Sequence, residues 1–237
     1  MIALAAMPFF GQWANVPKGK MDLAAAAPRT ADGKPDFSGV WQTDIKFNKN
    51  LAADLPAGAV LMTPWAKALY DERQANNSKD DPEGFCLPPG VPRAAGVPFP
   101  EKILQARDVI VILYETRTTF RQIFLDGRTP VADAQPTWMG YSTGQWNGDV
   151  LVVHTTGFND KTWLDDDGHP HSENMRVTER FRRPDMGHLV IEVTIEDAKA
   201  YVRPWTAVQT FRLLAGSDLL EYVCNENNVD LAHLTGK

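Results

Sequence analysis

Carboxylates and imidazoles are crowded into one short stretch of the chain, WLDDDGHPHSE at residues 163–173. Such side chains can bind a metal ion or transfer protons, and the same composition also suits a solvated polar turn. An Asp-x-Asp-Gly order resembles the start of a calcium loop, and a His-x-His order resembles the paired histidines of cupins. The side chains that could serve as metal ligands are Asp165, Asp167, His169 and His171.

The spacing around these ligands does not continue as a known metal motif. A calcium loop requires further oxygen ligands and a bidentate glutamate at its end. A cupin glutamate should lie four or five residues after His171, where Met175 and Arg176 stand. The pattern therefore favours no cofactor, and a divalent metal remains an alternative.

Glu179 is the main candidate for acid–base chemistry. It lies in a strand expected over 175–183 and shares one face of that strand with Met175, Val177 and Phe181. A carboxylate among apolar neighbours has a raised pKa unless a cation pairs with it, and it could exchange protons with His171. The alternative is that Glu179 binds an inward arginine, Arg121 or Arg128, and fixes the strand register.

The dipeptide Asn147-Gly148 predicts a two-residue type I′ hairpin that joins residues 138–146 to residues 149–158. Pairing Trp146 with Asp149 would place Tyr141 opposite His154, where the two could orient a substrate.

Other residues are candidates for substrate contact. A basic side chain, Arg121 or Arg180, could hold an anionic group or a developing oxyanion. Flat apolar surface could come from Trp138, Trp163 and Trp205, although tryptophans in a barrel are more often core.

The rest of the chain reads as one β-rich domain. Residues 1–36 resemble an extended arm or the remnant of a trimmed export signal, and residues 37–237 form the domain. A helix is predicted over 64–74, followed by a proline-rich loop over 76–100. Asp126-Gly127 suits a hairpin turn. The further strands are expected over 38–45, 109–114, 119–125, 188–196, 205–214 and 219–225.

Eight or nine antiparallel strands in succession predict an all-β fold. An up-and-down barrel or a strongly curved sheet, lipocalin-like, is favoured because closure removes exposed strand edges. A barrel of that size can hold one small ligand.

Composition limits the classes of partner. The 43% hydrophobic and 23% charged residues are typical of a globular protein, and the net charge of −6 disfavours nucleic acid. We find no run of about twenty apolar residues, so no membrane span is expected. Cys86 and Cys224 would form a disulfide in an exported protein and would be buried thiols in the cytosol.

Five blocks give the chain a resemblance to a known group of sequences. They are PRTADGKPDFSGVW, CLPPGVPR, RQIFLDGR, GQWNGDVLVVHTTGFND and GHPHSENMRVTERFRR. In this order the blocks resemble a family of exported bacterial proteins of unassigned function, found in soil bacteria, over nearly the whole chain from Pro28. The resemblance implies an exported or periplasmic, mostly β protein and brings no reaction with it.

Three functions fit these observations. The first is an enzyme of hydrolase, lyase or isomerase type that uses acid–base chemistry on a small molecule, with Glu179, His171, Tyr141 and His154 as its site. The second is a non-catalytic binding protein for a small hydrophobic ligand. The third is a metal-dependent enzyme that uses the Asp and His side chains of residues 165–171.

Overall fold

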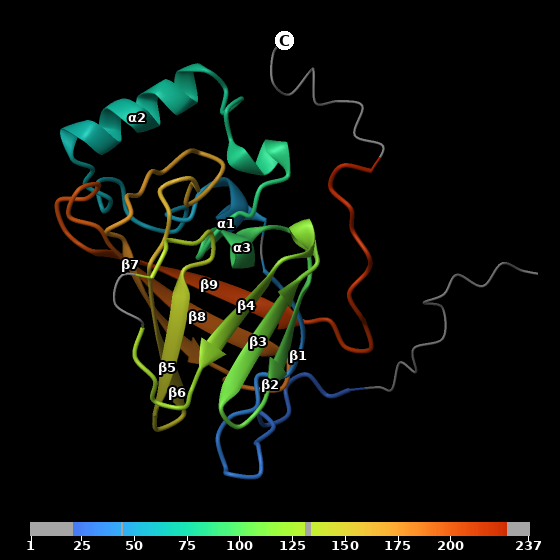
Figure 1. The fold of residues 1–237 in the computed structure, drawn as a ribbon. Coiled ribbons are helices and arrows are strands. Elements are labelled where there is room, and N and C mark those ends of the chain that lie inside the picture. The colour runs from blue at the N-terminus through green and yellow to red at the C-terminus, as the bar shows by residue number, and fades with distance from the viewer. Residues whose placement is uncertain (1–20, 44, 131–133, 227–237) are drawn as a thin grey trace, which may run out of the picture.

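A computed structural model describes residues 21–43, 45–130 and 134–226 of the chain. Nine strands within these residues close into a barrel, so the prediction of an all-β barrel is confirmed (Figure 1). The strands are β1 (Gly39–Thr43), β2 (Glu101–Gln105), β3 (Val109–Tyr114), β4 (Phe120–Phe124), β5 (Tyr141–Asn147), β6 (Val150–Thr156), β7 (Arg176–Arg182), β8 (His188–Glu196) and β9 (Trp205–Leu213).

The strands follow one another around the barrel in chain order, and β9 closes the ring by pairing with β1. Neighbouring strands run antiparallel with one exception, because β4 and β5 are parallel. Asp126-Gly127 is therefore not a hairpin turn, as the sequence had suggested, but the start of the longer connection that carries the chain back to begin β5. The sequence also did not predict β2, and the strand expected over 219–225 is absent from the described residues.

Short helices accompany the barrel. They are α1 (Lys46–Lys49), α2 (Pro64–Ala75), α3 (Arg93–Gly96) and the 3₁₀ turns η1 (Pro82–Phe85) and η2 (Thr116–Thr118). The predicted helix over 64–74 corresponds to α2, which begins after Thr63, whose hydroxyl accepts from the amide of Ala66. The predicted loop over 76–100 contains η1 and α3. None of the described helices is long and apolar enough to cross a membrane.

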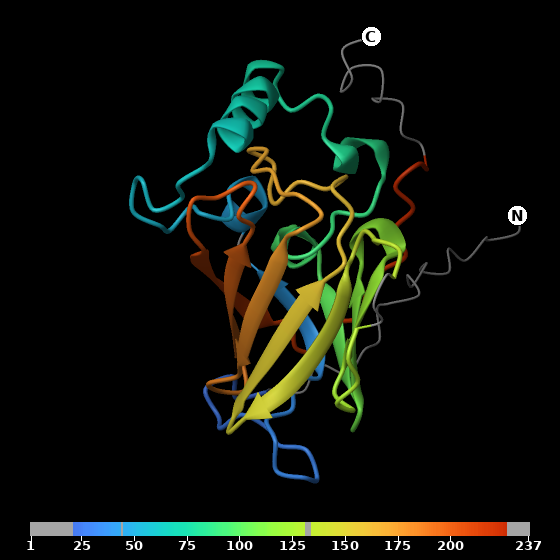
Figure 2. The ribbon, with the colours of Figure 1, turned by 60° about the vertical axis from the view of Figure 1, so that its left-hand side comes forward.

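The helices and the segment 158–175 all lie over one end of the barrel, which we call the covered end (Figures 1 and 2). Residues 21–36 run across the opposite end. There the inward side chains are apolar and almost fully buried, as strand alternation requires. They include Phe37, Leu151, Phe181, Leu189 and Phe211.

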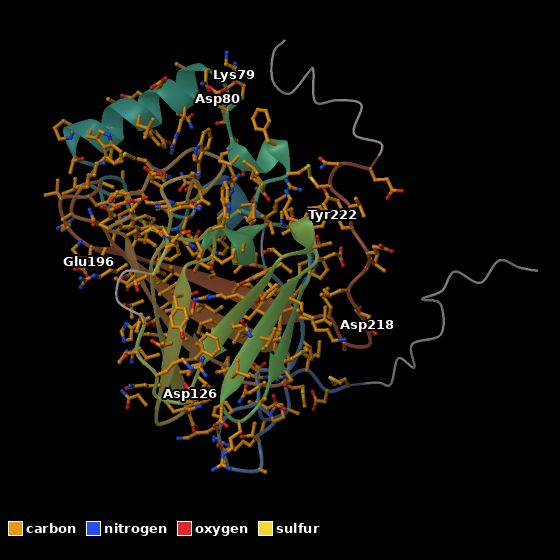
Figure 3. All side chains as sticks on the ribbon, viewed as in Figure 1. Lys79, Asp80, Asp126, Glu196, Asp218 and Tyr222 are labelled. Carbon is orange, nitrogen blue, oxygen red and sulfur yellow. A yellow bond between two sulfur atoms is a disulfide. The ribbon has the colours of Figure 1, made fainter. Side chains whose placement is uncertain are left out.

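A disulfide between Cys86 and Cys224 joins the loop after η1 to the segment that follows β9. This segment runs up the flank of the barrel, where Asp218 and Tyr222 lie along it (Figure 3). Lys102 forms an ion pair with Asp218, and Arg117 donates to the hydroxyl of Tyr222 at 3.1 Å. The predicted strand is thus replaced by a strap held by side chains.

Candidate functional site

Glu179 faces the interior of the barrel, as strand alternation predicted, and its side chain is 2% exposed. It meets Arg121, which points inward from β4. One guanidinium nitrogen of Arg121 donates to Oε1 of Glu179 at 3.0 Å and the other donates to Oε2, so the pair is bidentate. Of the two arrangements considered for Glu179, the structure has the ion pair with an inward arginine.

Two hydroxyl groups also accept hydrogen bonds from Arg121. Its Nε donates to Oγ of Ser142 at 2.9 Å, and a terminal nitrogen donates to Oγ1 of Thr155 at 2.8 Å. The two hydroxyls are also 3.0 Å from each other. Burial works to lower the pKa of Arg121, but the charge and hydrogen bonds of Glu179 outweigh it and leave that pKa above its ordinary range. The guanidinium is thus a fixed positive charge inside the barrel.

Glu101 adds a second carboxyl group to this interior. It is the first residue of β2, it is 3% exposed, and neither carboxyl oxygen has a hydrogen-bond partner among the described residues. Burial raises its pKa from 4.5 to about 8, partly opposed by the positive charge of Arg121. At neutral pH the group is therefore mostly protonated.

Tyr114 lies directly opposite Glu101 in the pairing of β2 with β3, and it is also buried. Burial and then the charge of Glu101 raise the pKa of the Tyr114 hydroxyl, so it stays neutral across the physiological range. We refer to these side chains together as the interior cluster, which consists of Glu101, Tyr114, Arg121, Ser142, Thr155 and Glu179.

Two more buried side chains of the barrel carry unpartnered polar atoms. On β9, both the amide nitrogen and the amide oxygen of Gln209 lack a hydrogen-bond partner in the described part of the chain, and so does Nε1 of Trp205. Buried polar groups normally have partners, so these atoms are groups that an interior water molecule or ligand could satisfy.

The stretch 163–173 is a buried, internally bonded loop of the covered end. Asp165 is fully buried, and its carboxylate accepts from the amides of Leu51 and His169 and contacts Nδ1 of His169 at 2.7 Å. Asp167 accepts from the side chain of Asn50 at 2.8 Å. The carboxylates thus hold the loop to the chain around α1.

His171 belongs to the same loop and has partners of its own. Its Nε2 lies 2.6 Å from Oγ1 of Thr162, and its Nδ1 lies 3.1 Å from the carbonyl oxygen of Ser172. Burial lowers the pKa of His171, which favours the neutral form of the ring. The expected proton exchange between His171 and Glu179 is not supported, because the hydrogen bonds of the two residues go to different groups.

The four side chains considered as metal ligands do not converge. His169 bonds to Asp165, whereas Asp167 and His171 turn to other partners. Over the residues that the structure describes, no group of three or more His, Cys, Asp or Glu side chains is arranged to hold a metal ion.

The prediction that Tyr141 faces His154 is wrong. Asn147 pairs with Val150, so the turn consists of Gly148 and Asp149, and the register places His154 opposite Thr143. Gly148 has φ +59° at the first turn position, where type II′ turns prefer glycine. Arg29 stabilises this turn by binding Asp149 with both terminal nitrogens.

The remaining candidates lie at the surface or in the core. On the outer face of the barrel, Tyr141 stacks on Phe124 and His154 is exposed. Arg180 is also on the outer face, near Glu192 at 3.8 Å, so it cannot hold a group inside the barrel. Of the three tryptophans, Trp163 and Trp205 are buried and Trp138 is half-buried.

Sequence reasoning missed Glu101, Ser142 and Thr155. If β2 had been recognised, strand alternation would have placed Glu101 on the same inward face as Ile103. Ser142 and Thr155 point inward by the same alternation, and the observed register makes them direct cross-strand partners.

No protein-family model matches the chain, and a search among curated proteins found no similar sequence. Function is therefore inferred from the barrel and its interior.

Proposed function

We propose that this protein is an enzyme that uses acid–base chemistry on a small molecule inside the barrel, toward the covered end. The observation that supports this proposal is the buried carboxyl group of Glu101, which has no hydrogen-bond partner among the described residues and lies near the Arg121–Glu179 pair. A buried polar group without a partner costs about 1–3 kcal/mol. A fold that retains several of them is consistent with a bound molecule that satisfies them.

The parts of the interior cluster suit different tasks. The Arg121–Glu179 pair supplies charges of both signs whose positions are fixed by Ser142 and Thr155, and preorganised charge stabilises a transition state without reorganisation. Glu101 supplies a carboxyl group with a pKa near neutrality, which suits proton transfer. Glu179 serves as the partner of Arg121 rather than as the free acid or base.

This function can be tested by measuring the turnover of a substrate panel by two double variants, each of which removes one ion pair. The substrates would be a panel of uncharged esters, lactones and hydroxyketones, which covers hydrolase, lyase and isomerase chemistry. Replacing the buried pair in R121M/E179L should abolish turnover and leave the fold intact, because a buried ion pair can be exchanged for apolar residues without loss of stability. The matched control is R182Q/E192Q, which removes an ion pair on the outer face. Equal loss in both variants, or full activity in R121M/E179L, would contradict the proposal.

A non-catalytic binding protein is the second candidate, and the apolar side chains of the barrel interior favour it. It predicts a ligand that stays bound through purification and is seen by native mass spectrometry, with no turnover of the panel. The metal-dependent alternative gains no support from the arrangement of residues 165–171.

We also propose that the protein is exported. A disulfide between Cys86 and Cys224 persists in an oxidising compartment such as the periplasm. Labelling of free thiols in protein taken directly from the periplasm and the cytoplasm would test this compartment.

A further inference from the structure

Most polar side chains of the interior cluster already have hydrogen-bond partners within the cluster. Arg121 directs its guanidinium to Glu179, Ser142 and Thr155, and Glu179 receives two of these hydrogen bonds. Glu101 is different, because both of its oxygens are buried and lack a partner among the described residues. Within the interior cluster, it is the group with hydrogen-bonding capacity left for a ligand.

The charges around Glu101 decide what kind of group it can receive. The titratable groups of other strands that act on it are Tyr114 on the neighbouring β3, Arg121 on β4 and Glu179 on β7. Arg121 and Glu179 cancel one another in charge, and Tyr114 is neutral. With Glu101 protonated, the interior cluster has no net charge.

An anion would be repelled by Glu179 and would lose its hydration on entry. A cation could ionise Glu101 and pair with it, but it would also lie close to the positive charge of Arg121. An uncharged group avoids both costs. A protonated carboxyl has one O–H donor, so the matching group is a hydrogen-bond acceptor.

We propose that Glu101 is the substrate-binding residue of the barrel and donates a hydrogen bond to an uncharged oxygen acceptor, such as the carbonyl of a ketone or ester. This inference rests on the proposed function. The apolar side chains of the interior would contact the hydrocarbon part of the same molecule.

Three probes with one apolar body and different head groups test this assignment: acetophenone, which is neutral, benzylamine, which is a cation, and benzoate, which is an anion. Binding to the full chain would be followed by NMR through the amide shifts of β2, β3 and β4. We expect acetophenone to bind and the two charged probes to bind at least about tenfold more weakly. Preferred binding of benzylamine would overturn the uncharged class.

Two variants of Glu101 make the test specific. Glu101→Gln keeps a buried donor of the same shape, so acetophenone should still bind. Glu101→Leu removes the donor and should weaken binding by about tenfold. In the wild type, affinity should fall as pH rises through about 8, because the donor is lost when Glu101 ionises, and this dependence should vanish in Glu101→Gln.

The outcomes separate this inference from the function on which it rests. Binding that shifts β2–β4 amides but is unchanged in Glu101→Leu would overturn the role of Glu101 and leave the interior site standing. Failure of all three probes to shift these amides at millimolar concentration would overturn both.

Discussion

At the scale of single residues, the barrel interior holds two carboxyl groups, Glu179 and Glu101, of which only one has a hydrogen-bond partner among the described residues. Glu179 and Glu101 are equally buried, but only Glu179 has an arginine in bidentate contact. Glu101 is therefore pushed toward its neutral form. Sequence alternation alone placed Glu179 inward correctly and named Arg121 as one of its two potential partners. It could not show which arginine would reach the carboxylate, because this depends on where β4 joins the barrel.

The raised pKa of Glu101 predicts a dependence of stability on pH. A group whose pKa rises from 4.5 to about 8 on folding binds its proton more tightly in the native state. Its contribution is fully present below pH 4.5, and stability is lost progressively as pH rises toward 8. Glu101→Gln should remove this loss and gain on the order of 3 kcal/mol near pH 7 relative to the wild type. Urea denaturation of both proteins between pH 5 and pH 8 would measure the difference, and parallel curves would contradict it.

At the scale of elements, the stretch 163–173 shows that residue types alone do not reveal whether polar side chains bind a ligand or hold a loop in place. Its carboxylates and imidazoles were plausible ligands, yet the loop is buried under the helices and uses these groups to satisfy backbone amides. Contacts that lie more than a hundred residues apart, such as that between Asp165 and Leu51, carry no local sequence signal. The parallel pairing of β4 with β5 was missed because Asp126-Gly127 suited a hairpin turn, which predicted an antiparallel return. By contrast, β3 and β8 had clear local patterns and were predicted with their full extents.

Asp165→Asn tests the structural role of this loop. The substitution keeps the shape but removes the charge that the amides of Leu51 and His169 bond to. Unfolding free energy should fall by about 2–3 kcal/mol because hydrogen bonds to a buried charged group are lost. Asp71→Asn is the control, since Asp71 forms an exposed pair with Lys67 on α2 and should change stability by less than about 0.5 kcal/mol. Equal effects of the two substitutions in thermal or urea unfolding would rule out the anchoring role.

At the scale of the whole molecule, closure of the barrel and the disulfide act on different parts of the chain. The barrel pairs β9 with β1, and the disulfide fastens the strap after β9 to the covered end. Composition and alternating strands were sufficient to predict the barrel. Residues 219–225 were predicted as a strand, whereas the strap is held by side-chain contacts, of Asp218 with Lys102 on β2 and of Tyr222 with Arg117 in η2 (Figure 3).

Removing the disulfide should weaken the fold without opening the barrel. The bond closes a loop with a sequence separation of 138 residues. A loop of this length corresponds to about 5 kcal/mol in the unfolded-state entropy model. The variant C86S/C224S should therefore unfold at lower urea concentration, while its native circular dichroism spectrum stays that of a β protein. An unchanged midpoint would show that the disulfide does not stabilise the fold.

The central claim is that Glu101 lies protonated and unpartnered inside the barrel at neutral pH. Carbon-13 NMR of glutamate carboxyl groups, with the Glu101 signal identified by its loss in Glu101→Gln, measures this directly. We predict that the signal titrates with a pKa near 8. Titration near the ordinary value of 4.5 would show a carboxyl group in contact with water and would contradict the proposed site.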